Sequence, residues 1–378
     1  YIPVPFPNYP PVIMPMKPGE KQLWRVANAT ADSILDMAVQ FNGVNQPLGE
    51  VALDGVPTGS QDGTQRGKTV TKTDILIPTA GRAEFIVTAP TDPTVNAQLV
   101  TLAINTGPAG DSDPFRPLGQ IQISRHAQEP PLTVQDSKVK IGKQRWEPAS
   151  TCTPTVQRTL YFSEVISDPT NPLSPTNFFI TVDGATPVVF EPTNPPAITT
   201  TQGSCEEWTI QNRATENHEF HMHQIHFLLE QKNGVNVPSD DAQFLDMVQL
   251  PFWDGVSSTF PSVKVKMSFE GMDIGDFVYH CHILGHEDNG MMAIIRVLPP
   301  DGKNTSSTKT ATPVKAAATT KAGESMKMDG SMKMDSNKAS EPAGFTVETN
   351  LSGSTVPKPV SSTAATTAPK PKASEDKK

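Results

Sequence analysis

Short runs of alternating apolar and polar residues, separated by turn residues, recur along most of the chain. Such a run is typical of a half-buried β-strand, because successive side chains point to opposite faces. With 37 prolines and 25 glycines in 378 residues, short strands joined by turns are expected rather than long helices. The predicted strands are Lys21–Asn28, Ile34–Phe41, Asp74–Ile77, Ala83–Thr88, Ala97–Ile104, Thr159–Glu164, Phe178–Val182, Trp208–Gln211, His218–Leu229, Ser262–Phe269 and Gly275–His282. This pattern predicts an all-β protein of β-sandwich architecture.

Composition divides the chain into four segments. Residues 1–130 and 155–299 carry the strand patterns, and each is long enough for one β-sandwich domain. Residues 131–154 lack clear alternation and are expected to form a linker. Residues 300–378 are dominated by Ala, Thr, Ser, Lys and Pro, with Phe345 as the only aromatic residue. Such a segment cannot offset its ordering entropy by burial, so we expect a disordered C-terminal tail.

Charge and hydropathy narrow the range of partners. The net charge is −9, and no basic stripe interrupts the part that is expected to fold, so nucleic acid is not an expected partner. No run is long and apolar enough to cross a bilayer, so no membrane span is expected.

The segment that begins with His280-Cys281-His282 carries the most specific chemical signal. The triplet places a thiolate between two imidazoles, and His286 and Met291 follow it. Two imidazoles, one thiolate and a weak axial thioether are the ligands of a blue-copper electron-transfer site. Zinc also binds histidine and cysteine, but a thioether and surplus histidines disfavour a closed tetrahedral zinc site. The sequence therefore predicts copper.

Strand parity sorts the candidate ligands into two sets. Cys281 faces away from the two histidines beside it, because neighbouring side chains of a strand alternate. In the segment 218–223, His221 and His223 share one face and His218 lies on the other. The first predicted set is His218, Cys281, His286 and Met291. The second predicted set is His221, His223, His280 and His282. Cys281 joins the two sets through its own backbone, which offers electrons a short covalent route.

Four residues of similar chemistry fall outside both sets. His226 and His126 are expected to be packed or hydrogen-bonded histidines rather than ligands. Cys152 and Cys205 can pair as a disulfide in an oxidising compartment or remain free thiols, and their spacing leaves both alternatives open.

Both histidine clusters resemble the third and fourth copper motifs of the multicopper oxidases, a family that includes laccases, bilirubin oxidases and copper-resistance oxidases. The flanking residues Val278–Leu284 and Gly290-Met291-Met292 are similar to family sequence as well. The resemblance implies tandem cupredoxin (plastocyanin-like) Greek-key β-sandwiches, with 1–130 and 155–299 as the family's second and third domains.

The resemblance also implies a role for each candidate ligand. A type 1 copper would be held by His218, Cys281, His286 and, as axial ligand, Met291. A type 2 copper would be held by His221, and a binuclear type 3 site by His223, His280 and His282. Glu287 matches a position that relays protons toward dioxygen in several relatives, although a solvated loop acid fits the same residue equally well.

The implied activity is that of an oxidoreductase. One-electron oxidation of a small reducing substrate at the type 1 copper would be coupled, through Cys281, to four-electron reduction of dioxygen to water at a trinuclear copper cluster. A methionine axial ligand favours easily oxidised substrates, namely a phenol, an aromatic amine or Cu(I). A periplasmic or secreted location is expected.

The chain departs from the family pattern in its first half. Half of the trinuclear ligands in the family come from an N-terminal domain with two His-X-His motifs, and this chain has no histidine before His126. We therefore expect the sequence to begin inside a longer protein, after a missing N-terminal cupredoxin domain.

Two alternatives to the complete oxidase remain. The first is a type 1 electron-transfer module without oxidase activity. The second is a copper-resistance oxidase whose tail collects Cu(I) through Met326, Met328, Met332 and Met334, although a solvated linker with incidental methionines fits that segment too.

Overall fold

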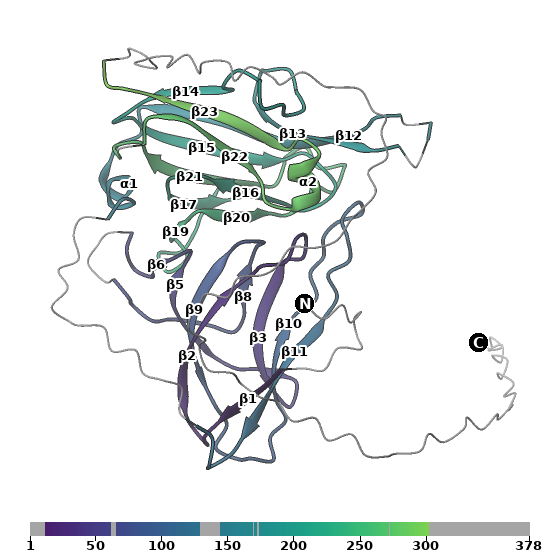
Figure 1. Cartoon of the computed structure of the whole chain (residues 1–378), viewed down its shortest axis with the longest axis vertical. Coiled ribbons are helices and arrows are strands. Elements are labelled where there is room, and N and C mark those ends of the chain that lie inside the picture. Colours follow the sequence, from purple (N-terminus) through teal and green to yellow (C-terminus); the bar gives the residue numbers. More distant parts are fainter. Residues whose placement is uncertain are drawn as a thin grey trace, which may run out of the picture. The chain divides into compact units, whose positions relative to one another are not determined.

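A computed structural model describes residues 12–61, 66–128, 144–168, 170–171, 174–271 and 273–301. This described part consists almost entirely of β-strands, with two helices of five residues each, so the predicted all-β fold is confirmed (Figure 1). Within it, no helix is long or apolar enough to cross a membrane. The predicted tail from residue 302 on, with its paired methionines, lies outside the described residues, as do residues 131–143 of the predicted linker.

The strands between residues 12 and 123 build a β-sandwich that we call the N-terminal sandwich, drawn in purple and blue in Figure 1. Its strands are β1 (Val12–Met16), β2 (Lys21–Ala27), β3 (Leu35–Phe41), β4 (Val44–Asn45), β5 (Leu48–Leu53), β6 (Val56–Pro57), β7 (Val70–Lys72), β8 (Ile75–Ile77), β9 (Arg82–Thr88), β10 (Ala97–Thr101) and β11 (Arg116–Ile123). One sheet has the order β1-β11-β10-β3-β4, with β8 beside β3. The other has the order β2-β9-β5-β6, with β7 beside β5.

The strands between residues 156 and 298 build the C-terminal sandwich, drawn in teal and green. Its strands are β12 (Val156–Ile166), β13 (Thr176–Val182), β14 (Ile198–Thr201), β15 (Cys205–Asn212), β16 (His218–Met222), β17 (Phe227–Lys232), β18 (Val235–Asn236), β19 (Phe244–Leu245), β20 (Met247–Leu250), β21 (Ser262–Ser268), β22 (Gly275–Cys281) and β23 (Met292–Leu298). One sheet has the order β13-β12-β15-β21-β17-β18, with β19 beside β17, and the other β14-β23-β22-β16-β20. The helices are α1 (Glu147–Thr151) and α2 (Leu284–Asp288).

Alternating burial explains why these segments form facing sheets. In β9 and β23 every second residue is buried, so each strand presents one apolar face. The apolar faces of the two sheets of each sandwich meet in one core, around Phe85 in the N-terminal sandwich and around Trp208 and Phe220 in the C-terminal one. Each large apolar side chain buried in this way contributes about 1.5–3 kcal/mol.

The prediction of one continuous strand over His218–Leu229 is wrong. β16 ends at Met222 and β17 begins at Phe227, and the two strands belong to different sheets. Between them Gln224 has a φ of 70°, and the Ile225 N–H donates to the His223 carbonyl (2.9 Å). The chain therefore turns sharply and crosses to the facing sheet. The apolar pattern conceals this turn because both strands bury side chains in the same core.

Hydrogen bonds and ion pairs join the two sandwiches. The Arg82 guanidinium at the start of β9 pairs with the Asp246 carboxylate just before β20, with Nη1 2.8 Å from Oδ1. The Asp54 carboxylate, which follows β5, accepts a hydrogen bond from the Asp246 backbone N–H (3.1 Å). Lys72 pairs with Asp241 in the same region. These contacts hold the N-terminal sandwich against the segment that leads into β20.

Cys152 and Cys205 form a disulfide that ties the end of α1 to the start of β15. Of the two alternatives left open by the sequence, the structure has the paired one. Cys281 is therefore the only free cysteine of the chain, and its side chain is buried.

Candidate metal centre

The pairing of β16 with β22 positions most of the ligand candidates. In this antiparallel pair Phe220 lies opposite Cys281, and His221 lies opposite His280. Directly opposed residues share a face of the sheet. Cys281 therefore points into the core beside Phe220, and His221 and His280 point away from it. Two residues before Phe220, His218 lies on the core face as well.

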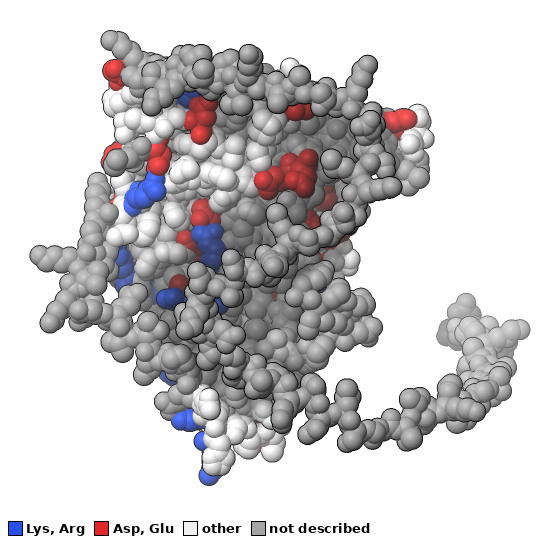
Figure 2. All heavy atoms as spheres, in the orientation of Figure 1, with Lys and Arg blue, Asp and Glu red and all other residues white. Residues whose placement is uncertain are grey.

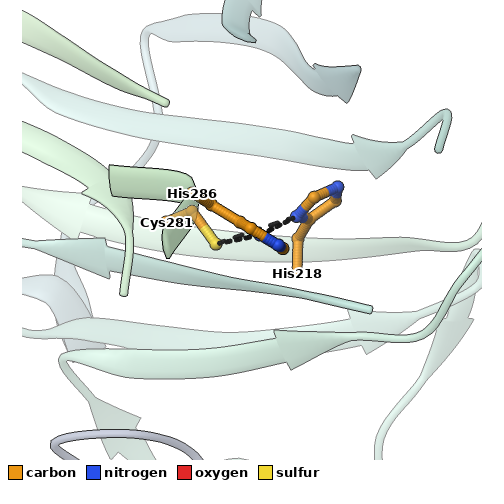
Figure 3. A group of neighbouring side chains, drawn as sticks. All are labelled: His218, Cys281 and His286. Atoms are coloured by element: carbon orange, nitrogen blue, oxygen red, sulfur yellow. Dashed lines mark hydrogen bonds between the residues drawn. The ribbon is translucent and has the colours of Figure 1, made fainter. Parts of the chain in front are cut away.

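A group that we call the inner cluster lies on the core side and consists of His218, Cys281 and His286 (Figure 3). The single turn of α2, directly after β22, brings His286 back to the cysteine. The two Nδ1 atoms of the histidines lie 3.0 Å apart. The Cys281 Sγ is 3.8 Å from the His218 Nδ1 and 3.6 Å from the His286 Nδ1. Met291 is buried in the same core, and its carbonyl accepts the Cys281 N–H (3.0 Å).

The inner cluster fits a soft divalent or monovalent metal ion. Three donor atoms at these separations can all contact one ion at about 2.0–2.3 Å, the range of nitrogen and sulfur bonds to such metals. Burial lowers the pKa of His286 to about 4 and lowers that of His218 well below its usual value, so both rings are neutral at pH 7. Burial raises the pKa of the Cys281 thiol, so a bound metal would have to displace its proton.

A second group, which we call the outer cluster, consists of His221, His223, His280 and His282. Its ring centroids lie 5.0 Å apart for His221 and His223 and 5.3 Å apart for His221 and His282. The Nε2 atoms of His223 and His280 are 3.2 Å apart. The four rings thus converge, although only His280 is fully buried.

Hydrogen bonds orient the rings of the outer cluster. The His221 Nδ1 donates to the Asp246 carbonyl (2.7 Å), and the His280 Nδ1 donates to the Cys281 carbonyl (2.8 Å). Burial lowers the pKa of His221 to about 4 and that of His280 to about 3. Both rings are therefore neutral, with Nδ1 bound to a backbone carbonyl and Nε2 left as the nitrogen that could bind a metal. The inner cluster gathers Nδ1 atoms instead, so the two clusters use opposite ring nitrogens.

Glu287 belongs with the outer cluster although it follows His286 in sequence. Its Oε2 lies 3.3 Å from the His280 Nδ1, and the side chain is partly buried. Burial raises its pKa, and the nearby His282 opposes that shift. A carboxyl group in this position can hold or deliver a proton beside the imidazoles.

Two acidic residues that the sequence reasoning missed lie beside the inner cluster. The Glu216 Oε1 is 3.3 Å from the His286 Nε2, and Glu164 groups with Glu216 and His218. Burial and the neighbouring Glu216 raise the pKa of Glu164 to about 8. Figure 2 shows a group of acidic side chains on the surface where Figure 1 draws α2, the helix that carries His286. The position of Glu216 two residues before His218 was the available signal, whereas nothing in the sequence marks Glu164.

The remaining histidines lie outside both clusters. The His226 Nε2 donates to the Asp54 carbonyl (3.0 Å), and its ring packs against Trp146 at 5.6 Å between centroids. His126 is exposed just after β11.

Sequence comparison identifies relatives of the part that carries the ligands. A family model described as multicopper oxidase matches residues 167–301. The multicopper oxidase mco of Staphylococcus haemolyticus is 33% identical over 96 residues, which are 24% of this chain and 20% of that protein. A laccase of Haloferax volcanii is 34% identical over 91 residues, which are 24% of this chain and 15% of that protein. The matches therefore span about a fifth or less of these curated relatives.

Solved structures share the fold over a longer range. A multicopper oxidase from Campylobacter jejuni, described as a metallo-oxidase, has a TM-score of 0.53 at 21% identity, covering 72% of this chain and 53% of that one. A multi-copper oxidase from Pediococcus acidilactici has a TM-score of 0.51 at 20% identity, covering 77% of this chain and 52% of that one. The chain thus spans about half the length of these structures. At such identities the likeness establishes the fold alone.

Fold and site together define a protein of tandem cupredoxin-like β-sandwiches with two clusters of side chains that could hold metal ions. Residues 167–301 match the multicopper oxidase family model, and the curated relatives share that name or are laccases, so the C-terminal sandwich is similar to this family.

Proposed function

We propose that the inner cluster and Met291 hold a type 1 copper, and that the chain is part of an oxidase that couples oxidation of a small reducing substrate to reduction of dioxygen to water. The observation that carries this proposal is the arrangement of one thiol and two neutral imidazoles around a common point in the core. Bound copper would supply the one-electron redox chemistry.

Electrons would enter at the His286 edge of the inner cluster. The Glu216 Oε1 lies 3.3 Å from the His286 Nε2, and Glu164 adds a second carboxyl group nearby. Carboxyl groups at this edge favour a substrate that is a cation or that releases a proton on oxidation. Cu(I), an aromatic amine and a phenol all meet that description.

The backbone around Cys281 would carry electrons onward to the outer cluster. Cys281 contributes its side chain to the inner cluster, and its carbonyl accepts a hydrogen bond from the His280 Nδ1 of the outer one. In this proposal His221 holds a type 2 copper, and His223, His280 and His282 hold one side of a type 3 pair. Glu287, beside His280, would hold or supply protons. Further histidines would come from another cupredoxin domain.

A second candidate is a type 1 electron-transfer module without oxidase activity. It is favoured by one observation: within the described residues only four imidazoles converge at the outer cluster, and the N-terminal sandwich offers no ligand to it.

A periplasmic or secreted location is part of the proposal. The disulfide between Cys152 and Cys205 supports it, because disulfides persist in oxidising compartments and are rare in the cytosol.

Copper titration of the full chain tests the proposal. We expect an intense thiolate-to-copper absorption and a type 1 EPR signal, both lost in Cys281→Ser and both retained in His226→Gln, which alters a histidine outside the clusters. Copper or zinc bound without thiolate absorption would contradict the type 1 assignment.

Sequencing upstream of the present first codon separates the two candidates, because in-frame His-X-His motifs support the oxidase and their lack favours the module.

A further inference from the structure

A turn of the N-terminal sandwich contacts residues next to both clusters. Thr79 lies between β8 and β9, and its backbone N–H donates to both carboxyl oxygens of Glu219, at 3.1 Å and 3.0 Å. The Thr79 hydroxyl also contacts the Glu219 carboxyl group. Both side chains are fully buried. Among the described residues, every side-chain hydrogen bond of Glu219 goes to Thr79.

The Glu219 backbone is bound to the strand that carries the cysteine. Its N–H donates to the Cys281 Sγ (3.4 Å), and its carbonyl accepts the His282 N–H (3.0 Å). The Thr79 hydroxyl lies 2.6 Å from the His282 carbonyl oxygen. One threonine therefore contacts both Glu219, whose N–H bonds the cysteine sulfur, and His282, which follows the cysteine in sequence.

The turn that carries Thr79 is itself held in place. The Ala80 N–H donates to the Asn28 carbonyl (2.9 Å), and the buried Asn28 side chain donates to the Ile77 carbonyl (3.0 Å). The same sandwich holds the start of α2, because the Leu284 N–H donates to the Ala31 carbonyl and the Gly285 N–H to the Asp32 carboxylate, both at 3.0 Å. The contacts come from a hydrogen-bonded turn and a neighbouring loop of the same sandwich rather than from one side chain alone.

A buried carboxyl group is tolerated only where its hydrogen bonds are made, so Thr79 fixes where Glu219 sits. We propose that Thr79 and Glu219 are a positioning pair through which the N-terminal sandwich aims the Glu219 N–H at the Cys281 sulfur. Hydrogen bonding at a ligating sulfur tunes the potential of the metal it binds. The pair thus gives the histidine-free sandwich a role in the redox site. The tuning rests on the proposed type 1 copper, whereas the positioning does not.

The first test uses the metal-free full chain. Cys281 is its only free thiol, so its reaction with an aromatic disulfide reagent reports local opening around the sulfur. We expect Thr79→Val to react at least tenfold faster than wild type, and Thr79→Ser, which keeps the hydroxyl, to react near the wild-type rate. Lys72→Met, which breaks a contact between the sandwiches away from the clusters, should leave the rate unchanged. Equal rates for Thr79→Val and wild type would overturn the proposal, as would equal acceleration in Lys72→Met.

The second test uses the copper-loaded chain. A hydrogen bond to the sulfur favours reduced copper, so its loss should favour oxidised copper. We therefore expect Thr79→Val to shift the equilibrium with a one-electron redox mediator at least threefold toward oxidised copper. The thiolate-to-copper absorption should also change its wavelength. Thr79→Ser should restore both. An unchanged equilibrium and absorption would overturn the tuning. If the wild-type chain forms no type 1 copper, the proposed function is wrong. The reaction rates of the Cys281 thiol in the metal-free chain still test the positioning role of Thr79. Unfolding midpoints of all variants show that each one folds.

Discussion

The two sandwiches share an architecture but divide the chemistry unequally. Each consists of two facing sheets around one core. The C-terminal sandwich carries every residue of both clusters, whereas the N-terminal sandwich contains no histidine and no cysteine among its described strands. It contacts the segments that carry or adjoin the cluster residues through hydrogen bonds of Thr79, Arg82 and Asp32. A sandwich that contributes no side chain to a cluster can therefore still hold the residues of that cluster in place.

The largest effect is expected from removing the thiol of the inner cluster, which only the C-terminal sandwich provides. Cys281→Ser takes the only thiolate from the inner cluster, and we expect the copper affinity of that cluster to fall by more than about 100-fold, because losing a ligand costs more than losing an outer-shell contact. Copper stoichiometry after dialysis measures the loss. Retention of the wild-type stoichiometry with full colour would show that the cysteine is no ligand.

Breaking the main ion pair between the sandwiches should give the next largest effect. Arg82→Met leaves the carboxyl groups of Asp54 and Asp246 without their cation. We expect the free energy of unfolding to fall by about 2 kcal/mol. This value is lower than for a fully buried pair, because the Arg82 side chain is 37% exposed and solvent screens its charge. Chemical denaturation measures it. Arg296→Met is the matched control, since it breaks an exposed pair within one sheet, and it should cost clearly less. Equal losses would remove any special role for the contact between sandwiches.

The pH dependence of stability tests the buried Asp54, which also lies at the contact between the two sandwiches. Burial, and then the charge of Asp246, raise the pKa of Asp54 to about 7. The folded state holds this proton more tightly than the unfolded state, so its contribution is complete near pH 4 and is lost as pH rises toward 7. We expect the slope to reach at most about 1.4 kcal/mol per pH unit and to be smaller in Asp54→Asn. Denaturation at several pH values measures the slopes, with exposed Asp276→Asn as control, and parallel curves for all three proteins would refute the assignment.

The smallest expected effect concerns His226, which contacts the other sandwich without joining either cluster. His226→Gln loses one hydrogen bond to the Asp54 carbonyl, so we expect less than about 1 kcal/mol of destabilisation. Its copper spectrum should match that of wild type. A change in the spectrum would assign the residue to the site after all.

Local patterns predicted the strands and the grouping of the ligands, because both depend on residues that are close in sequence. The alternation in Ala83–Thr88 corresponds to most of β9, and the parity of His280 and Cys281 anticipated that they face different clusters. Short strands with little alternation, such as β14, were missed. The crossing at Gln224 was missed because it depends on one backbone angle rather than on a hydrophobic pattern.

Contacts between distant segments could not be predicted from one sequence. Thr79 and Glu219 are 140 residues apart, and neither stands out by its neighbours. Glu164 reaches Glu216 only because β12 pairs with β15 in the folded sheet. Such residues surround the two clusters, and only the folded arrangement of the strands reveals them.

The disulfide has a consequence for the order of events during biosynthesis. Cys152 and Cys205 both precede Cys281 in the chain. A polypeptide that emerges with its amino end first exposes these two thiols to one another before the third appears. With these two thiols paired, Cys281 has no other cysteine in the chain with which to form a disulfide. The linear order of the cysteines would therefore allow the crosslink to form before the third thiol is synthesised.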